Sequence, residues 1–195
     1  MKEFSLKGTL RTDIGKKASR ELRKLDIIPC NIYGVKKDEN GPVATSFTVP
    51  MSELRNLIYT PNVYIVNIEL GGENKKAIIK EIQFHPTTDK VLHVDFYEIT
   101  EDKDIVIGVP VKLNGLAEGV RAGGRLNLSI RSIKVKAKYT VIPDVLDIDV
   151  TPLQIGKSIK VGALHFEGLQ FATSPEVVVC SIKATRKSIQ AANEG

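Results

Sequence analysis

The fold is decided by the stretch EIQFHPTTDKVLHVDF, residues 81–96, in which two alternating runs flank a turn-forming centre. Residues 86–90 predict the loop of a β-hairpin. Symmetric pairing about this loop places Gln83 opposite His93 and Glu81 opposite Asp95. Because side chains alternate between the faces of a strand, one face becomes apolar and the other polar. The apolar face comprises Ile82, Phe84, Leu92, Val94 and Phe96, and the polar face Gln83, His85, His93 and Asp95.

Strand signals continue on the N-terminal side of this hairpin. Residues 63–70 and 75–85 flank a Gly-Gly-Glu-Asn turn signal at 71–74, and shorter strands are expected at 4–10, 31–34 and 43–49. Two helices interrupt them, one over 16–25 and one over 51–58, directly after Pro50. The first part of the chain, residues 1–98, is therefore predicted to be a mainly β domain with a few helices.

Positive charge is concentrated near the N-terminus. The chain has 28 Lys and Arg against 23 Asp and Glu, a net charge of +5. Residues 7–24 hold seven basic and two acidic residues, so this segment carries the whole excess. Neighbours on the first helix lie three and four residues apart, which gives an expected buried stripe and a polar cluster. The stripe is Ala18, Leu22 and Leu25, and the cluster is Lys16, Ser19, Arg20 and Arg23. Such clustering favours a polyanionic partner, and the planar arginine fork suits phosphate.

A second domain is expected from residue 99 to 185. It begins after a polar, acidic segment and consists of Val- and Ile-rich runs separated by Gly and Pro, which predicts an all-β domain. The expected strands are 105–113, 126–139, 146–150, 158–161 and 177–184, with one helical turn at 151–156. Residues 186–195 are polar and are expected to form a short flexible tail.

The composition excludes several classes of protein. Every apolar run falls far short of the roughly 20 residues of a membrane helix, and the N-terminus lacks the apolar core of a secretion signal. We therefore expect a cytoplasmic protein without a membrane partner. The two cysteines, Cys30 and Cys180, lie 150 positions apart, so neither a disulfide framework nor a zinc ribbon is expected.

Two chemical alternatives and one open question accompany this interpretation. His85, His93 and Asp95 have the donor types of a metal site, although no His-x-His pair or HExxH helix supports one, and a hydrogen-bonding cluster is favoured. The glycines of residues 119–125 lack a phosphate-loop pattern and indicate a β-loop. A row of lysines indicates a solvated or edge-protecting face, or a secondary RNA contact. The row is Lys134, Lys136 and Lys138.

The order and spacing of several short motifs resemble a known family, the long form of bacterial large-subunit ribosomal protein twenty-five (the Ctc family). In the first half these motifs are Arg11, Gly15-Lys16, Ser19-Arg20, Leu22-Arg23, Ile28-Pro29, Ile32-Tyr33-Gly34, Gln83, His85-Pro86 and His93-Val94-Asp95-Phe96. In the second half they are residues 119–124, Ile142-Pro143, Asp149-Val150 and Ile155-Gly156.

The resemblance implies a fold and a partner. It implies an N-terminal six-stranded β-barrel that binds 5S ribosomal RNA at its loop E region, in the central protuberance of the large subunit, without catalysis or a cofactor. The second domain is then expected to touch neighbouring large-subunit proteins or ribosomal RNA. The RNA contacts implied by matching position are Arg11, Lys16, Ser19, Arg20, Tyr33, Gln83, His85, His93 and Asp95, with Arg23 as a basic neighbour.

We hypothesise a division of labour among these residues. Arg11, Lys16, Arg20 and Arg23 would position phosphates, and the other residues would read sugar and base edges in a wide, shallow minor groove. Two other functions are alternatives to this one. The barrel resembles an anticodon-binding domain of some aminoacyl-tRNA synthetases, which suggests a tRNA-binding module, and the histidine cluster suggests a metal-dependent hydrolase.

Overall fold

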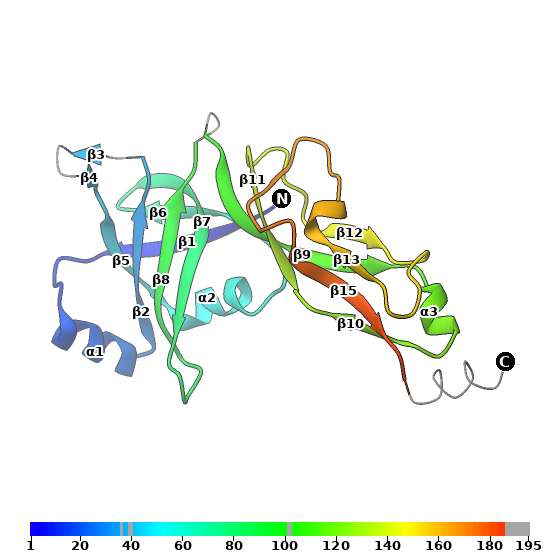
Figure 1. The fold of residues 1–195 in the computed structure, drawn as a ribbon. Coiled ribbons are helices and arrows are strands. Elements are labelled where there is room, and N and C mark those ends of the chain that lie inside the picture. The colour runs from blue at the N-terminus through cyan, green and yellow to red at the C-terminus, as the bar shows by residue number, and fades with distance from the viewer. Residues whose placement is uncertain (36, 39–40, 101–102, 186–195) are drawn as a thin grey trace. The chain divides into compact units, whose positions relative to one another are not determined.

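The computed structural model describes residues 1–35, 37–38, 41–100 and 103–185 (Figure 1). The chain divides into two compact units, residues 1–103 and 104–195, which are described separately. The tail expected at 186–195 lies outside the described residues. No helix among the described residues is long and apolar enough to cross a membrane.

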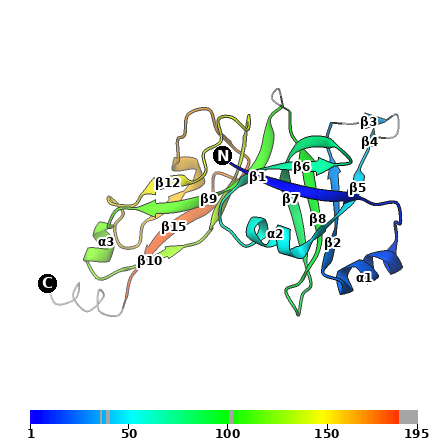
Figure 2. The same cartoon turned by 180° about the vertical axis from the view of Figure 1, so that it is seen from behind.

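The first unit is a closed six-stranded β-barrel, as expected (Figures 1 and 2). Two of its strand pairs are parallel, β1 with β6 and β2 with β8, and the other pairs are antiparallel. In order around the barrel the strands are β1 (Lys2–Leu10), β5 (Thr45–Pro50), β2 (Ile27–Tyr33), β8 (Val91–Glu98), β7 (Glu73–Phe84) and β6 (Tyr64–Leu70). A small ribbon of β3 (Lys37–Asp38) and β4 (Gly41–Pro42) is inserted between β2 and β5.

The barrel interior is filled by the inward side chains of all six strands. Phe47 and Phe96 meet at the centre with ring centroids 5.7 Å apart, and both are completely buried. Branched aliphatic residues such as Val49 and Ile68 surround them. Burial of this apolar surface is the main stabilising contribution to the unit.

The β6–β7 hairpin turns more tightly than the sequence predicts. Leu70 pairs with Glu73, so only Gly71 and Gly72 form the turn, with φ values of 58° and 90°. Consecutive left-handed residues are typical of the two-residue turn whose twist matches that of the strands, and glycine adopts them without strain.

The two helices differ in burial. Helix α2 (Met51–Ile58) has the predicted bounds and buries Leu54 and Leu57 against the barrel core. Helix α1 (Lys16–Lys24) contains no fully buried residue. The predicted burial of Leu25 is wrong: the helix ends one residue earlier, the chain turns at Asp26 with φ 54°, and Leu25 is 72% exposed.

The second unit consists of two small sheets and short helical turns, which confirms a second mainly β domain. One sheet has the order β12-β9-β11-β14 and the other β10-β15-β13. The strands are β9 (Ile105–Asn114), β10 (Arg125–Leu128), β11 (Ser132–Ala137), β12 (Leu146–Asp149), β13 (Ser158–Lys160), β14 (Gln170–Phe171) and β15 (Val178–Lys183). The short helices are α3 (Glu118–Arg121) and η1 (Val161–Ala163).

Three local predictions for this unit are wrong. The strand predicted at 126–139 is two strands in different sheets, because the chain crosses between them where Ser129 N–H donates to the carbonyl of Val179. The helical turn predicted at 151–156 does not form, because the carbonyls of Thr151 and Leu153 accept instead from the N–H groups of Glu118 and Gly119. Glu118 and Gly119 are the first two residues of α3, and this helix overlaps residues 119–125, for which the sequence predicts a β-loop.

Candidate nucleic-acid interface

The polar face of the β7–β8 hairpin has the predicted register. Gln83 pairs with His93, and Glu81 pairs with Asp95. On β8, Val94 lies between His93 and Asp95 and Phe96 follows Asp95, and both point inward and are completely buried. The hairpin therefore presents its polar side chains on the outside of the barrel.

Phe84 departs from the prediction. It is 43% exposed rather than buried, at the last residue of β7, and the register shifts beside it, so that Phe84 pairs with Val91. The predicted burial of Leu92 is also wrong: the pairing skips Leu92, which is only half-buried, and Val91 takes its core position. An irregularity of this kind adds one residue to a strand and re-aims the side chains that follow it.

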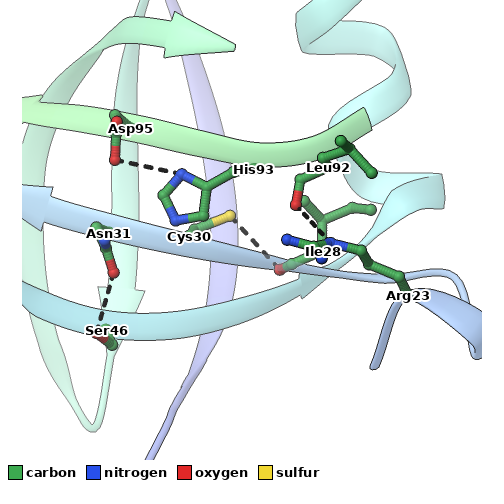
Figure 3. A network of polar contacts seen from close by, with 8 residues as sticks. All are labelled: Arg23, Ile28, Cys30, Asn31, Ser46, Leu92, His93 and Asp95. Atoms are coloured by element: carbon green, nitrogen blue, oxygen red, sulfur yellow. Dashed lines mark hydrogen bonds and ion pairs between the residues drawn. The ribbon is translucent and has the colours of Figure 1, made fainter. Parts of the chain in front are cut away.

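His93 and Asp95 form the centre of this face (Figure 3). The Nδ1 atom of His93 lies 3.4 Å from the Oδ1 atom of Asp95, and about one-fifth of each side chain is exposed. Partial burial lowers the pKa of His93, with Arg23 and Arg11 acting in the same direction and Asp95 opposing them. A neutral imidazole has one donor and one acceptor nitrogen. The carboxylate favours the proton on Nδ1, which leaves Nε2 as an acceptor.

The polar face extends across four strands. The register places Ser46 of β5, Asn31 of β2, Asp95 of β8 and Glu81 of β7 side by side. The hydroxyl of Ser46 donates to Oδ1 of Asn31 over 3.0 Å (Figure 3). Sequence reasoning missed Ser46 and Asn31 as site residues. The sequence does contain a signal for these two residues, because Ser46 and Asn31 are each a polar residue whose neighbours along the strand face inward.

Helix α1 is attached to this face by arginine. The Nε–H of Arg23 donates to the carbonyl of Leu92 over 2.9 Å, which joins the helix to β8 beside His93 (Figure 3). Arg11, just after β1, donates through Nη2 to the hydroxyl of Ser19 over 2.8 Å. The structure thus brings Arg11, Ser19 and Arg23 to the edge of the polar face.

Lys16 and Arg20 lie on the exposed part of α1. They are four residues apart and therefore project from the same side of the helix. Residues 16–24 contain five basic residues and one acidic residue, Glu21. Within the N-terminal segment of the first unit, positive charge is therefore most concentrated on α1.

Tyr33 and His85 lie at opposite ends of the face. Tyr33 ends β2 and pairs with Tyr97 of β8, with ring centroids 6.1 Å apart in an edge-to-face arrangement. Burial and the nearby carboxylates of Asp95 and Glu81 raise the pKa of Tyr33, so its phenol stays neutral and can donate a hydrogen bond.

His85 follows β7, and its Nδ1 accepts from the backbone N–H of Thr87 over 3.3 Å and contacts the Thr87 hydroxyl at 3.1 Å. This turn occupies the Nδ1 lone pair of His85. Among the residues that the structure describes, no group of three His, Cys, Asp or Glu is placed to hold a metal ion. The metal hypothesis for His85, His93 and Asp95 therefore has no geometric support.

Cys30 lies behind the polar face. Burial, together with the charge of Asp95, raises the pKa of its thiol to about 12. The thiol donates to the carbonyl of Ile28 over 3.6 Å (Figure 3). A neutral, buried thiol is a poor nucleophile and a poor metal ligand.

Both units match known protein families. Residues 6–96 match the Ribosomal L25p family, and residues 104–186 match the family described as Ribosomal protein TL5, C-terminal domain. Over nearly the full chain, it is 58% identical to the large ribosomal subunit protein bL25 of Phocaeicola vulgatus, covering 98% of each chain. It is 49% identical to the bL25 protein of Porphyromonas gingivalis, with 98% of each chain covered, and 43% identical to that of Parabacteroides distasonis, with 100% covered.

The chain belongs to the bL25 family.

The bL25 assignment confirms the family resemblance seen in the sequence, including its long form, because both family matches are present in order. The bL25 relatives are named as ribosomal proteins and not as enzymes, so the hydrolase hypothesis is rejected. The lysine row lies in the TL5-like unit of this bL25 chain, and all three lysines are exposed. Edge protection does not explain Lys136, because β11 pairs with β9 on one side and with β14 on the other at this residue.

Proposed function

We propose that this chain is a structural component of the large ribosomal subunit that binds 5S ribosomal RNA at its loop E region, in the central protuberance. The observation that carries the proposal is the hydrogen bond from Arg23 to the carbonyl of Leu92, which holds a basic helix against the strand that bears His93 and Asp95. The proposed phosphate-binding and edge-reading groups are thereby held beside one another. The family resemblance supports 5S ribosomal RNA as the partner.

The basic residues position the RNA backbone in this proposal. Lys16 and Arg20 project from α1, and Arg11 and Arg23 lie where the helix meets the barrel. The bond of Arg23 to Leu92 uses only Nε, and a guanidinium has five N–H donors, so its outer nitrogens can serve a phosphate. Contacts of this kind fix register and orientation without reading sequence.

The polar face reads the groove. A-form RNA presents 2′-hydroxyls and base edges in a wide, shallow minor groove, which a gently curved sheet face can approach. Tyr33 and Gln83 offer donors, and the Nε2 atom of His93 offers an acceptor. Asp95 accepts from a base amino group or a 2′-hydroxyl, and the positive charge of α1 offsets its repulsion from phosphate. Ser19 and His85 complete the set at the helix and at the hairpin loop.

The two units have different roles in this proposal. The domain of residues 1–98 binds 5S ribosomal RNA, and the domain of residues 99–185 contacts neighbouring large-subunit proteins or ribosomal RNA. The exposed row of Lys134, Lys136 and Lys138 is the candidate RNA contact of the second domain. The protein is then cytoplasmic and bound to the ribosome.

Binding of the full chain to 5S ribosomal RNA, with excess tRNA as competitor, tests the proposal over a salt series from about 50 to 200 mM. Tight binding that survives tRNA is expected, whereas equal binding of both RNAs would reduce the site to a non-specific basic patch. Arg20→Ala should lower the slope of log affinity against log salt by about 0.9, the value for one phosphate of a duplex. Lys157→Ala, which removes an exposed cation of the second unit, is the matched control and should leave the slope unchanged.

A further inference from the structure

A hollow of about 380 Å³ lies between α1 and the neighbouring strands β1 and β5. We call it the α1 groove. Its apolar lining consists of Leu10, Ala18, Leu22 and Leu25, with Thr48 at the β5 side. At about 100° per residue, Ala18 and Leu22 project from the side of α1 opposite Lys16 and Arg20. The α1 groove is therefore separate from the basic side of the helix.

The apolar walls of the α1 groove are open to solvent. Leu25 is 72% exposed and Leu10 is 53% exposed, and Ile14, in the segment that joins β1 to α1, is 77% exposed. Leu25 and Ile14 are the most exposed large apolar side chains among the described residues. Single exposed leucines are ordinary, but two open leucines that line one hollow, with Ile14 in the adjoining segment, are typical of a surface that another molecule covers.

The charged residues that line the α1 groove indicate which kind of partner it binds. Residues 7–24 contain only two acidic residues, Asp13 and Glu21, and both line the α1 groove. The basic residue in its described lining is Arg11, whose guanidinium donates to the carbonyl of Asp13 and to the hydroxyl of Ser19. Carboxylates repel phosphates and attract cations, so this rim favours a cationic partner over RNA.

We propose that the α1 groove docks a segment of a neighbouring ribosomal protein in which an aliphatic side chain stands beside a lysine or arginine. The aliphatic side chain covers Leu10 and Leu25, and the cation lies between Asp13 and Glu21. Helix α1 is then held from two sides, by RNA on its basic side and by protein on its apolar side. This inference rests on the proposed function, because it requires the chain to sit in the large subunit beside other proteins.

Retention on large subunits that have been depleted of this protein and then reloaded tests the inference. Leu25→Ser should lower retention about tenfold, the loss of one leucine-sized apolar contact, while affinity for free 5S ribosomal RNA stays unchanged. Leu116→Ser is the control, because Leu116 is an exposed leucine of the second unit, 53% exposed, that does not line the α1 groove. An equal loss for both serine variants, or none for Leu25→Ser, would overturn the docking site.

Glu21→Lys separates a protein partner from RNA at the same place. A cationic protein segment predicts weaker retention although the change adds positive charge, whereas RNA in the α1 groove predicts stronger retention and would overturn the proposal. A photo-crosslinking amino acid at position 10 should join a ribosomal protein at a Lys- or Arg-containing peptide, and a crosslink to ribosomal RNA would contradict it. Failure of the unaltered protein to bind free 5S ribosomal RNA would instead overturn the proposed function itself.

Discussion

Replacing Arg23 with lysine keeps the charge of α1 but removes the Nε–H donor that binds the carbonyl of Leu92 over 2.9 Å. The change isolates the attachment of the helix from its charge. Because α1 contains no fully buried residue, few contacts hold it against the barrel. We expect Arg23→Lys to loosen the helix and weaken the binding of 5S ribosomal RNA.

The magnitude follows from the kind of bond that is lost. A hydrogen bond to a charged group contributes about 1.5–3 kcal/mol, and this partly buried one belongs near the lower value. A loss of about 1.4 kcal/mol corresponds to about a tenfold lower affinity. Arg23→Ala also removes the proposed phosphate contact, which costs about a further eightfold in 0.1 M salt if the slope per phosphate is about 0.9.

Fluorescence anisotropy of labelled 5S ribosomal RNA over a salt series measures both quantities. Arg23→Lys should lower the affinity with the salt slope unchanged, and Arg23→Ala should lower both. Arg20→Lys, the same exchange at an exposed position of α1, is the matched control and should bind as the unaltered protein does. Unaltered binding by Arg23→Lys would refute the positioning role of the contact with Leu92, and an equal loss in Arg20→Lys would assign the effect to the guanidinium shape alone.

Three further predictions concern stability. Burial lowers the pKa of His93 below its ordinary value of about 6.5. The unfolded chain therefore binds the proton more readily than the folded chain does. As a result, the free energy of unfolding should fall as pH drops below about 6.5. Urea titrations between about pH 8 and pH 5 should show a smaller fall for His93→Gln, and identical falls would contradict the assignment. Phe47→Ala should lower the free energy of unfolding by about 3–5 kcal/mol, because the ring is completely buried against Phe96, and chemical denaturation measures this loss. Gly119→Ala should destabilise the second unit by about 1–3 kcal/mol, because its Cβ would lie 2.6 Å from the backbone nitrogen of Ile155, whereas Gly108→Ala meets nothing closer than 3.7 Å and should be neutral. Limited proteolysis distinguishes Gly119→Ala from Gly108→Ala, and binding of 5S ribosomal RNA should be unchanged in both of these variants.

The parts of the site that lie within one hairpin were predictable from the sequence. The alternation in β8 leaves one face apolar, which fixes the pairing of Gln83 with His93 and of Glu81 with Asp95. Asn31 and Ser46 were missed because their strands reach Asp95 only through the parallel pairing of β2 with β8. Such pairing joins residues more than 60 positions apart, and local periodicity contains no information about it.

Helix ends and strand irregularities were the other limits. The stripe of Ala18, Leu22 and Leu25 has helical spacing, but α1 ends at Lys24, so the last member projects into solvent. Leu92 has the parity of a core residue, and a single shift of register gives the core position to Val91. In both cases one residue of difference reverses the environment of a large apolar side chain.

The closure of the barrel has a consequence for synthesis. Strand β8 lies between β2 and β7 and is the last of the six strands to be made, and it brings His93 and Asp95 with it. A growing chain therefore exposes the basic helix long before it can complete the polar face, and contacts between distant segments form slowly. If the polar face reads RNA as proposed, selective binding begins only when the whole domain has been translated. Chains that stop before residue 91 would then retain the charge but not the proposed recognition surface, so incomplete copies would compete poorly for the RNA.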